Sequence, residues 1–311
     1  MVNPIEDPLN SENNYSYQGH LFICKQINMK KSALKPVLLL LMIFISLGGE
    51  ALNVKILGDS VRYINPIFEK VDVQKDILFC EVANFEGKTE KLLLDVYTPN
   101  GDIQSARPVI MWIHGGGFRP GNDKSQNYIV KMATEFAKRG YVCVSINYRV
   151  RNNPKEDKSG TLSDALEDAI SGLYWIRNND GKLKIDKTKI IVGGGSAGGM
   201  LAVNLCYKDN TASGKWDKSG IIGVVNLWGS PDNSWTVSKV DKNDPPTIIV
   251  HGTSDESVPY GNSEQLVKEL ETNEVKHELI AIAGAGHTPV SHIDEFVKNI
   301  AEFLYGLILQ N

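Results

Sequence analysis

The 311-residue sequence has few cysteines, no run of basic residues, no internal repeat and no low-complexity tract. Its formal net charge of −4 argues against nucleic acid as a partner, because a nucleic-acid-binding domain presents a basic patch. Three of the four cysteines lie in apolar runs and are expected to be small core residues rather than a disulfide framework: Cys80, Cys143 and Cys206. None of them has the spacing of a metal-ligand set, so no metal site is predicted.

Long hydrophobic runs are also scarce, and the longest, residues 37–45, is too short for a comfortable membrane span. Lysines precede this run and small residues follow it, which is the pattern of a secretory signal peptide. We therefore expect the true start at Met29, a cleaved signal peptide over 29–51 and an upstream extension over 1–28. The mature protein is then secreted or periplasmic and has no stable membrane span. The alternative, an uncleaved N-terminal membrane anchor, stays open.

The rest of the chain has an ordinary globular composition, 42% hydrophobic and 23% charged. Two strand patterns, 76–85 and 91–97, are expected to pair antiparallel around a turn at Glu86 and Gly87. Buried strands and helical patterns then alternate, with strands expected at 108–113, 141–147, 189–193, 222–228, 247–251 and 277–283 and helices at 126–139, 163–177, 200–207, 261–271 and 292–305. This alternation predicts one α/β domain over 52–311, built on a doubly wound, mostly parallel sheet.

The clearest chemical motif is centred on Ser196, which has Gly194 two residues before it and Gly198 two residues after it. A β-branched run precedes the glycines and a helical pattern follows, which is the setting that the G-x-S-x-G nucleophile elbow requires. The serine of such an elbow has a strained backbone, so its neighbours must lack a Cβ. We therefore predict Ser196 as the nucleophile and expect the amide of Ala197, at the start of the helix, to stabilise developing negative charge.

A second glycine-rich loop, His114-Gly115-Gly116-Gly117, directly follows the strand predicted at 108–113. Consecutive glycines let a backbone approach a bound carbonyl closely and direct its amides inward. This is the HGGG-type oxyanion loop that accompanies the elbow. We assign the oxyanion hole to the amides of Gly116, Gly117 and Ala197, and we expect His114 to brace the loop rather than to transfer protons.

The serine needs a base and an orienting acid. His287 lies among glycines in the loop after the last predicted strand, whereas His251 lies within a strand and is set aside. Asp255 lies at the carboxyl end of the strand 247–251 and precedes His287, as this fold requires. The neighbouring Glu256 is the alternative acid. The predicted triad is therefore Ser196, Asp255 and His287.

Four motifs in this order carry a resemblance to a known family: the HGGG loop, Tyr148-Arg149, the elbow, and D-x-x-V-P followed by G-H. The chain resembles secreted bacterial carboxylesterases of the α/β-hydrolase superfamily, both those related to hormone-sensitive lipase and the feruloyl and acetyl-xylan esterases. The hormone-sensitive-lipase group carries Asp before the nucleophile, whereas this chain has Gly195, which favours the feruloyl and acetyl-xylan branch. The resemblance implies a serine carboxylesterase that works through an acyl-enzyme and needs no cofactor.

A covering lid is the last missing feature. Residues 229–245 are polar and residues 149–160 are charged, so neither pattern predicts an amphipathic lid helix. We therefore expect an open site for short acyl groups and small-molecule or carbohydrate alcohols. Phe118 and Trp228 are the expected substrate contacts. Trp228 and Trp235 are expected at the rim of the site, with core packing the alternative for both.

Three other functions are alternatives to esterase activity. An arylformamidase or other amidase would use the same triad and a similar glycine loop. A non-catalytic hydrolase-fold binding module is disfavoured, because such modules tend to lose a triad member and none is missing here. A peptidase of the prolyl-oligopeptidase type usually carries an added propeller, which this chain length cannot hold.

Overall fold

A single sheet of eight strands organises the computed structural model, which describes residues 61–209, 216–236 and 239–311. The predicted extension and signal peptide, residues 1–51, lie outside the described residues. The strands are β1 (Val71–Ala83), β2 (Thr89–Pro99), β3 (Arg107–Ile113), β4 (Val142–Ile146), β5 (Ile185–Gly195), β6 (Ile221–Leu227), β7 (Thr247–Gly252) and β8 (His277–Ile282). Across the sheet they lie in the order β1-β2-β4-β3-β5-β6-β7-β8.

The first two strands form the antiparallel pair that the sequence predicts. β1 pairs antiparallel with β2 and β2 pairs antiparallel with β4, whereas every other neighbouring pair is parallel. β1 begins earlier than predicted, at Val71, because residues 71–74 pair with β2 although none of their side chains is buried. The prediction of a doubly wound, mostly parallel sheet is confirmed.

The central strand β3 is buried on both faces, which explains its continuous apolar sequence. Val109, Met111 and Ile113 belong to the core on one face of the sheet. Ile110 and Trp112 belong to the core on the other face. A strand packed in this way fixes the position of the loop that leaves its carboxyl end.

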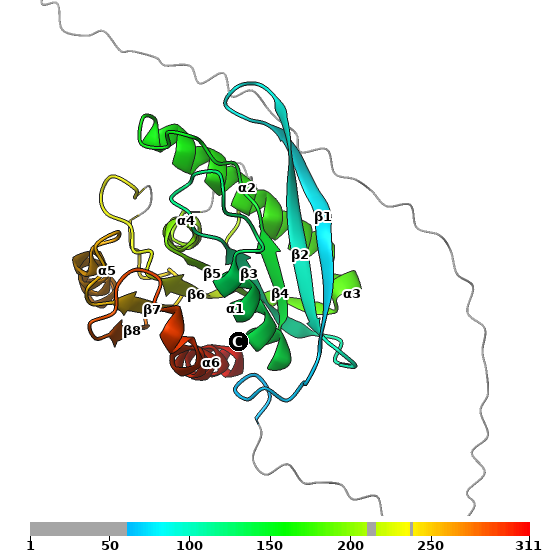
Figure 1. Ribbon diagram of the computed structural model, residues 1–311. Coiled ribbons are helices and arrows are strands. Elements are labelled where there is room, and N and C mark those ends of the chain that lie inside the picture. The colour runs from blue at the N-terminus through cyan, green and yellow to red at the C-terminus, as the bar shows by residue number, and fades with distance from the viewer. Residues whose placement is uncertain (1–60, 210–215, 237–238) are drawn as a thin grey trace, which may run out of the picture.

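Helices cover both faces of the sheet (Figure 1). One face packs against α1 (Asn127–Lys138) and α6 (Ile293–Gln310). The other packs against α2 (Lys158–Asn178), α4 (Ala197–Cys206) and α5 (Tyr260–Thr272). Two short helices complete the described elements, α3 (Asp180–Leu183) and the 3₁₀ turn η1 (Val290–His292).

The start of α2 corrects one prediction. The sequence pattern places the start near Ser163, but the helix begins at Lys158. Asp157 caps it, because the Asp157 carboxylate accepts a 2.9 Å hydrogen bond from the amide of Gly160. The polar first turn of α2 carries no apolar period, which is why the pattern missed it.

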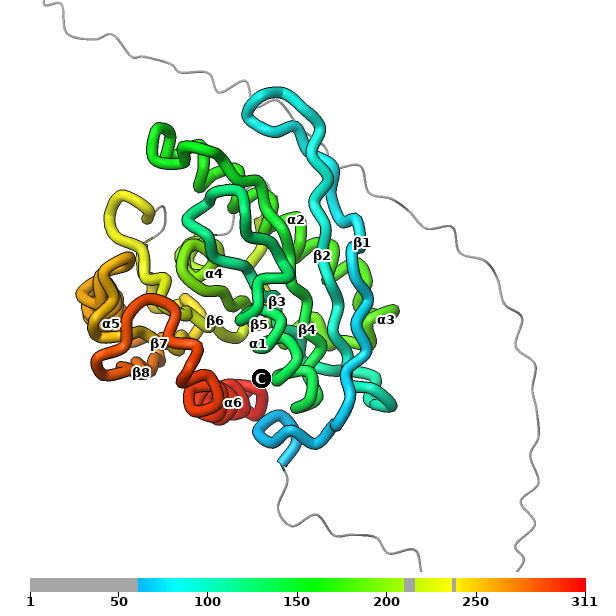
Figure 2. Tube along the Cα trace, viewed as in Figure 1, coloured from blue at the N-terminus to red at the C-terminus, as the bar shows by residue number. Residues whose placement is uncertain are grey.

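The loops after β3, β5, β7 and β8 leave the same edge of the sheet, because parallel strands all end there. The tube view in Figure 2 shows the β1–β2 pair at one lateral side of the sheet and β8 at the other. The four loops that carry the predicted site residues therefore converge between these two sides.

The cysteines agree only in part with the prediction. Cys143 and Cys206 are buried free thiols, and burial raises the pKa of both. Cys80 is equally buried but is disulfide-bonded, so the expectation of an unpaired core thiol is wrong for that residue. Apolar surroundings suit a thiol and half of a disulfide alike, so sequence context could not separate the two.

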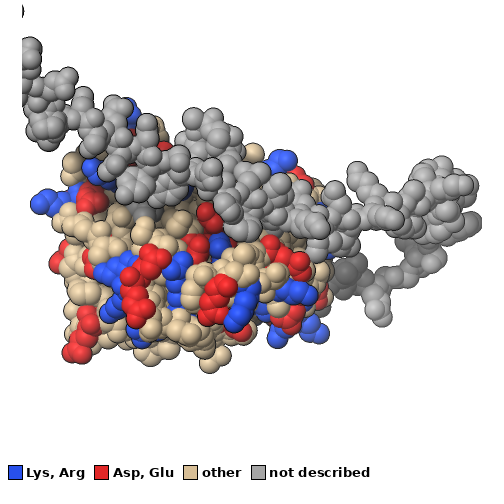
Figure 3. Space-filling view, turned by 90° about the horizontal axis from the view of Figure 1, so that it is seen from above, with Lys and Arg blue, Asp and Glu red and all other residues tan. Residues whose placement is uncertain are grey.

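The surface shows no field of one sign on the face seen in Figure 3, where Lys and Arg lie beside Asp and Glu. Of the helices in the described part of the chain, none has the length and apolar character to cross a membrane.

Candidate active site

Ser196 lies in the sharp turn between β5 and α4. Its backbone has φ 55° and ψ −123°, a conformation that residues other than glycine rarely adopt. A Cβ on Gly198 would overlap the carbonyl oxygen of Ile113, and a Cβ on Gly194 would overlap the backbone of Gly198. The turn therefore closes only with glycine at both flanking positions.

The structure brings Ser196, His287 and Asp255 into one hydrogen-bonded line. Ser196 Oγ lies 2.9 Å from His287 Nε2, and His287 Nδ1 lies 2.7 Å from Asp255 Oδ2. Since Nδ1 donates to the carboxylate, Nε2 is left to accept the hydroxyl proton. Glu256, the alternative acid, is exposed, whereas the Asp255 side chain is fully buried against the histidine.

The Asp255 carboxylate has its hydrogen-bonding capacity filled. Oδ1 accepts bonds from the amides of Ser257 at 2.8 Å and Val258 at 3.0 Å, and Oδ2 accepts from His287 and, at 3.1 Å, from His251 Nε2. Burial alone opposes ionisation, but the bonds from His287 and the two amides outweigh it and hold the pKa of Asp255 below its ordinary value. The carboxylate is therefore charged and fixed in orientation.

The HGGG loop passes beside Ser196 with two glycines in conformations that favour glycine. Gly116 has φ 114° and Gly117 has φ 62°. Both residues and Ala197 line the pocket over the serine, and none of their three amides donates a hydrogen bond to another described residue. Unpaired amides beside a nucleophile are suited to bind an oxyanion.

Side chains from the start of α1 hold this loop against the end of β5, directly before Ser196. The amide of Gly115 donates to Gln126 Oε1 and to Tyr128 Oη, each at 2.9 Å. Tyr128 Oη in turn donates to the carbonyl of Gly195 at 3.2 Å. One tyrosine thereby fixes the distance between the oxyanion loop and the residue that precedes Ser196.

His114 braces the same loop from within the core. Its ring stacks on Tyr148, with centroids 4.4 Å apart, and its Nδ1 donates to the carbonyl of Gly115 at 2.7 Å. Tyr148 Oη donates to the carbonyl of His114 at 3.0 Å. Burial lowers the pKa of His114 to about 4, so its ring is neutral near pH 7.

A pocket of about 720 Å³ opens over Ser196 and His287. We call the inner part of the site the floor: the predicted triad and residues 114–117. Its members line the pocket except His114 and Asp255, which are buried behind it. We call its outer wall the rim: residues 118–119, 154–158 and 232–235. The rim carries three cations, Arg119, Lys155 and Lys158.

The aromatic wall of the rim differs from the prediction. Phe118 lines the pocket as expected and stacks on Trp235, with centroids 5.0 Å apart and planes at 15°. Trp228 does not line the pocket: it is fully buried and packs edge-on against Tyr128 and Phe296. The expected substrate contact at Trp228 is wrong, because the side chain at this end of β6 faces the core shared with α1 and α6.

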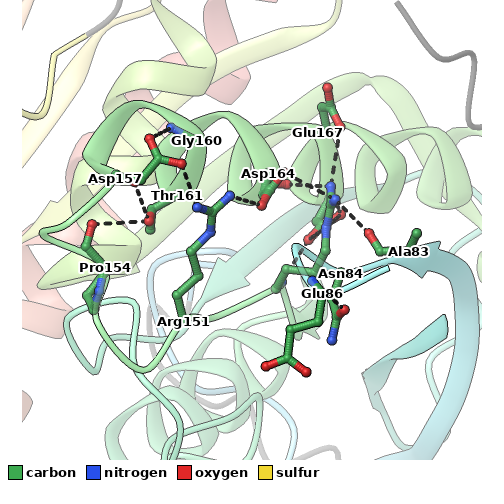
Figure 4. Close-up of polar contacts among 12 residues, drawn as sticks. Ala83, Asn84, Glu86, Arg151, Pro154, Asp157, Gly160, Thr161, Asp164 and Glu167 are labelled. Atoms are coloured by element: carbon green, nitrogen blue, oxygen red, sulfur yellow. Dashed lines mark hydrogen bonds and ion pairs between the residues drawn. The ribbon is translucent and has the colours of Figure 1, made fainter. Parts of the chain in front are cut away.

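Ion pairs hold the rim segment 154–158 in place (Figure 4). Arg151 donates to Asp157 and to Asp164 of α2, each at 2.6 Å. Thr161 Oγ1 donates to the carbonyl of Pro154 at 3.2 Å, and the Arg151 amide donates to the carbonyl of Phe118 at 2.9 Å. The charged stretch that the sequence shows is therefore an anchored loop joined to α2 and to the oxyanion loop.

Three of the eight described non-glycine residues with a positive φ line the pocket. Phe118, Ser196 and Thr288 have φ of 60°, 55° and 62°. Ser196 is the predicted nucleophile, Phe118 follows the HGGG loop and Thr288 follows His287. Such conformations persist only where the surrounding structure imposes them.

Sequence reasoning did not assign a role to two residues of the site: Tyr128 and His251. The signal for His251 was available, since a histidine before Gly252 at the end of a buried strand must face either the core or the site. Tyr128 gave no comparable signal, because it looks like an ordinary aromatic residue of a helix. Trp235 was expected at the rim, and it lines the pocket there.

Two family models match the chain. The BD-FAE model matches residues 94–232, which include the HGGG loop and Ser196. The model of the prolyl oligopeptidase family matches residues 204–308, which include Asp255 and His287. The two matches together span the whole site.

Several curated relatives and solved structures are esterases. The chain is 26% identical over 245 residues to a probable isoprenylcysteine alpha-carbonyl methylesterase of Oryza sativa subsp. japonica, covering 65% of this chain and 55% of that protein. It is 24% identical over 234 residues to Esterase LipC of Mycobacterium tuberculosis, covering 63% and 56%. The chain thus spans about half the length of these curated relatives.

The likeness to solved structures extends over most of the fold. The esterase Est2 of the planctomycete Thermogutta terrifontis superposes with a TM-score of 0.60 at 25% identity, covering 76% of this chain and 92% of that one. The sheet order, the position of the serine turn and these matches all indicate the α/β-hydrolase fold.

Proposed function

We propose that this α/β-hydrolase is a serine carboxylesterase in which Ser196 is the nucleophile, His287 the general base and Asp255 the orienting acid. The observation that carries the proposal is the hydrogen-bonded line from Ser196 Oγ through His287 to Asp255, which ends in an open pocket. The esterase relatives support the choice of ester chemistry.

The acylation step follows from the positions of these groups. His287 Nε2 takes the hydroxyl proton while Ser196 Oγ bonds to the ester carbonyl carbon, and the carbonyl oxygen becomes an oxyanion. The amides of Gly116, Gly117 and Ala197 bind that oxyanion, and each such donor contributes on the order of 3 kcal/mol in related chemistry. His287 then passes its proton to the leaving alcohol.

Deacylation repeats the same steps with water. His287 takes a proton from the water as its oxygen attacks the acyl carbon, and returns that proton to Ser196 Oγ when the acid leaves. Asp255 stabilises the imidazolium in both steps without itself becoming protonated.

The pocket favours a short acyl group. No helix covers it among the described residues of 229–245, and its aromatic wall consists of Phe118 and Trp235. An acyl chain longer than this wall leaves methylenes in water and forfeits about 0.8 kcal/mol for each one.

The alcohol side favours a hydroxyl-rich group such as a carbohydrate. A second groove of about 650 Å³ shares Asp232 and Asn262 with the pocket and is lined by further side-chain amides: Asn233, Gln265 and Asn273. Amides both donate and accept hydrogen bonds, which suits the hydroxyl groups of a sugar.

The direct test compares p-nitrophenyl acetate, butyrate, octanoate and palmitate as substrates of the purified protein. We expect kcat/KM to be highest for acetate or butyrate and to fall with chain length, with Ser196→Ala as the inactive control. Values that rise toward palmitate would overturn the short-acyl assignment and leave the esterase assignment intact.

A second comparison tests the alcohol side. Acetylated xylo-oligosaccharides and feruloylated arabinose are measured beside ethyl acetate and methyl ferulate. The proposal predicts a higher kcat/KM for the sugar esters, and equal values for sugar and alkyl alcohols would contradict it.

Amide substrates separate this proposal from its nearest rival. The match of the prolyl oligopeptidase family model to residues 204–308 makes amide bonds a fair comparison. N-formylkynurenine and a dipeptidyl p-nitroanilide are therefore measured beside p-nitrophenyl acetate. We expect the ester to be the better substrate, and a faster amide would transfer the assignment to an amidase.

We also propose that the enzyme is exported by the leader predicted at 29–51. Expression from Met29 in a bacterial host should yield periplasmic or secreted protein that begins near Leu52. A chain that keeps residues 37–45 in the membrane fraction would favour an uncleaved anchor.

A further inference from the structure

A continuous chain of buried polar groups lies behind Asp255, on the side away from the substrate. It runs from Asn226 of β6 through Ser230 and Ser263 to His251 of β7. The successive distances are 2.8 Å from Asn226 Nδ2 to Ser230 Oγ, 2.7 Å from Ser230 Oγ to Ser263 Oγ, and 2.7 Å from Ser263 Oγ to His251 Nδ1. All four residues are fully buried.

The two ends of this chain fix the direction of every hydrogen bond in it. His251 Nε2 faces two acceptors, Asp255 Oδ2 at 3.1 Å and the carbonyl of Val258 at 2.9 Å, so Nε2 carries a proton. Burial lowers the pKa of His251, so its ring is neutral and Nδ1 must accept. Ser263 therefore donates to His251.

The remaining bonds follow from the single proton of each hydroxyl. Because Ser263 donates to His251, it accepts from Ser230, and Ser230 accepts in turn from the amide of Asn226. Asn226 Oδ1 accepts from the amide of Gly229 at 3.1 Å, which completes the partners of the chain. With Nδ1–H donating to Ser263 instead, the unprotonated Nε2 of a neutral ring would face two acceptors, Asp255 Oδ2 and the carbonyl of Val258.

We propose that His251 is a positioning residue for the catalytic acid and that Ser263, Ser230 and Asn226 hold it in the Nε2–H tautomer. This rests on the proposed function, in which Asp255 orients His287. The Nε2–H of His251 and the Nδ1–H of His287 bond to the same carboxylate oxygen, Asp255 Oδ2. The carboxylate is thus held from behind while it orients the base in front.

The groups around His251 support a positioning rather than a proton-transfer role. Asp255 and His287 are the titratable groups coupled to it, and the ring of Tyr260 from α5 packs against it edge-on at 5.7 Å. His251 has no exposed surface and does not line the pocket. It therefore acts on the reaction through Asp255.

Two substitutions at one position separate this role from simple packing. In His251→Gln the side-chain amide reaches the place of Nε2 and still donates to Asp255 Oδ2. In His251→Asn the shorter amide reaches only the place of Nδ1, so contact with Ser263 remains and the donor to Asp255 is lost. Both variants bury a neutral amide at the same site, and the packing loss from the one methylene by which they differ is read from their Tm values.

The readout is the rate at which a fluorophosphonate probe labels Ser196, measured together with kcat and KM for p-nitrophenyl acetate. We expect His251→Asn to lower the labelling rate and kcat by about 10- to 30-fold. This is in line with the 10- to 100-fold losses of activity or affinity seen when a group that orients a metal-binding side chain is removed. KM should stay within twofold, and His251→Gln should lose less than about threefold.

Ser263→Ala supplies an independent variant that keeps the imidazole. It removes the donor to Nδ1 and so releases the tautomer, and we expect a smaller loss of about three- to tenfold. Thr247→Val is the control for stability, because it breaks a buried 2.6 Å hydrogen bond to Tyr207 at the opposite end of β7. It should lower Tm without changing the labelling rate.

Three results would overturn the inference: His251→Asn labelling as fast as wild type, His251→Gln as slow as His251→Asn, or Thr247→Val as slow as either. If His251→Asn does not fold, an unchanged labelling rate in Ser263→Ala overturns it instead. A wild-type protein that neither labels nor hydrolyses the ester would contradict the proposed function, which is a different failure.

Discussion

The polar side chains of the floor are paired, whereas the rim is largely exposed and its three cations form no ion pair with another described residue. On the floor, Asp255 has four donors and His114 is neutral. On the rim, Arg119 and Lys155 are exposed and Trp235 is only half-buried. Residues of both regions line the same pocket, but the groups that hold the floor in place are buried behind it.

The difference shows which part of the site needs exact geometry. The floor must place four loops to within hydrogen-bonding distance, and it does so with buried bonds whose loss leaves unsatisfied groups. The rim needs only a surface on which an alcohol or acyl group can rest. Changes on the floor should therefore alter kcat or folding, and changes on the rim should alter KM.

Among changes to the floor, Ser196→Ala should cause the largest loss of activity. We expect kcat/KM for p-nitrophenyl acetate to fall by about 10⁴-fold or more, with Tm nearly unchanged. His287→Ala should reach a similar level, and the double variant should be no worse, because members of a triad act as one unit. Activity near wild type in Ser196→Ala would remove it as the nucleophile.

The next break is steric. Gly198→Ala places a Cβ against the carbonyl oxygen of Ile113, so it should lower the free energy of unfolding by about 3 kcal/mol and abolish most activity. Gly261→Ala in α5 is the matched control, because its Cβ meets only the Glu264 carboxylate, at 3.9 Å, and a helical alanine adds about 0.5 kcal/mol. Urea unfolding of both variants checks this, and equal stabilities would show that the elbow is more yielding than the contacts indicate.

The burial of His114 makes the stability of the protein depend on pH. The pKa of His114 falls from 6.5 to about 4 on folding, because its ring is buried. The unfolded chain therefore binds a proton between pH 6.5 and 4 that the folded chain does not, and the free energy of unfolding drops as the pH is lowered through this window, by up to about 3 kcal/mol. His251 shifts in the same direction and adds to the slope.

His114→Asn isolates this contribution. The asparagine amide can replace Nδ1 as a donor to the carbonyl of Gly115 but does not titrate, so its unfolding free energy should vary less between pH 4 and 6.5 than that of the wild type. Chemical denaturation across this range gives the two slopes. Parallel slopes would remove His114 as the source.

The smallest effect should come from the rim. Trp235→Ala removes the ring that stacks on Phe118, and we expect KM for p-nitrophenyl butyrate to rise three- to tenfold with kcat within twofold. Trp235→Phe keeps a stacking partner and should stay within twofold in both constants. A loss in kcat rather than KM would show that the rim also positions the floor.

Most of the fold was predictable because apolar periodicity reports burial directly. The strand around Ile110 and Met111 reads as a continuous apolar run because both of its faces are covered. The start of α2 at Lys158 was not predictable from periodicity, because its first turn is polar and is fixed by the Asp157 cap. The disulfide at Cys80 was not predictable either, since its apolar surroundings resemble those of Cys143.

The predicted site residues differ in how local their signals are. Ser196 and the glycines around it form one motif, and a turn that excludes a Cβ leaves few alternatives. Asp255 and His287 follow from chain order at the ends of strands. The prediction for Trp228 was wrong because the direction of a side chain at the end of β6 depends on which helices pack there. No local sequence pattern carries that information.

The left-handed backbone at Phe118 and Thr288 has a consequence for protein engineering. A glycine or asparagine in place of Thr288 would relax that conformation and raise thermal stability, yet it would also loosen the loop that carries His287. Substitutions that raise thermal stability by relieving this strain are thus also expected to lower the catalytic rate. A search for durable variants should begin at helix surfaces such as that of α5 and leave these strained positions as they are.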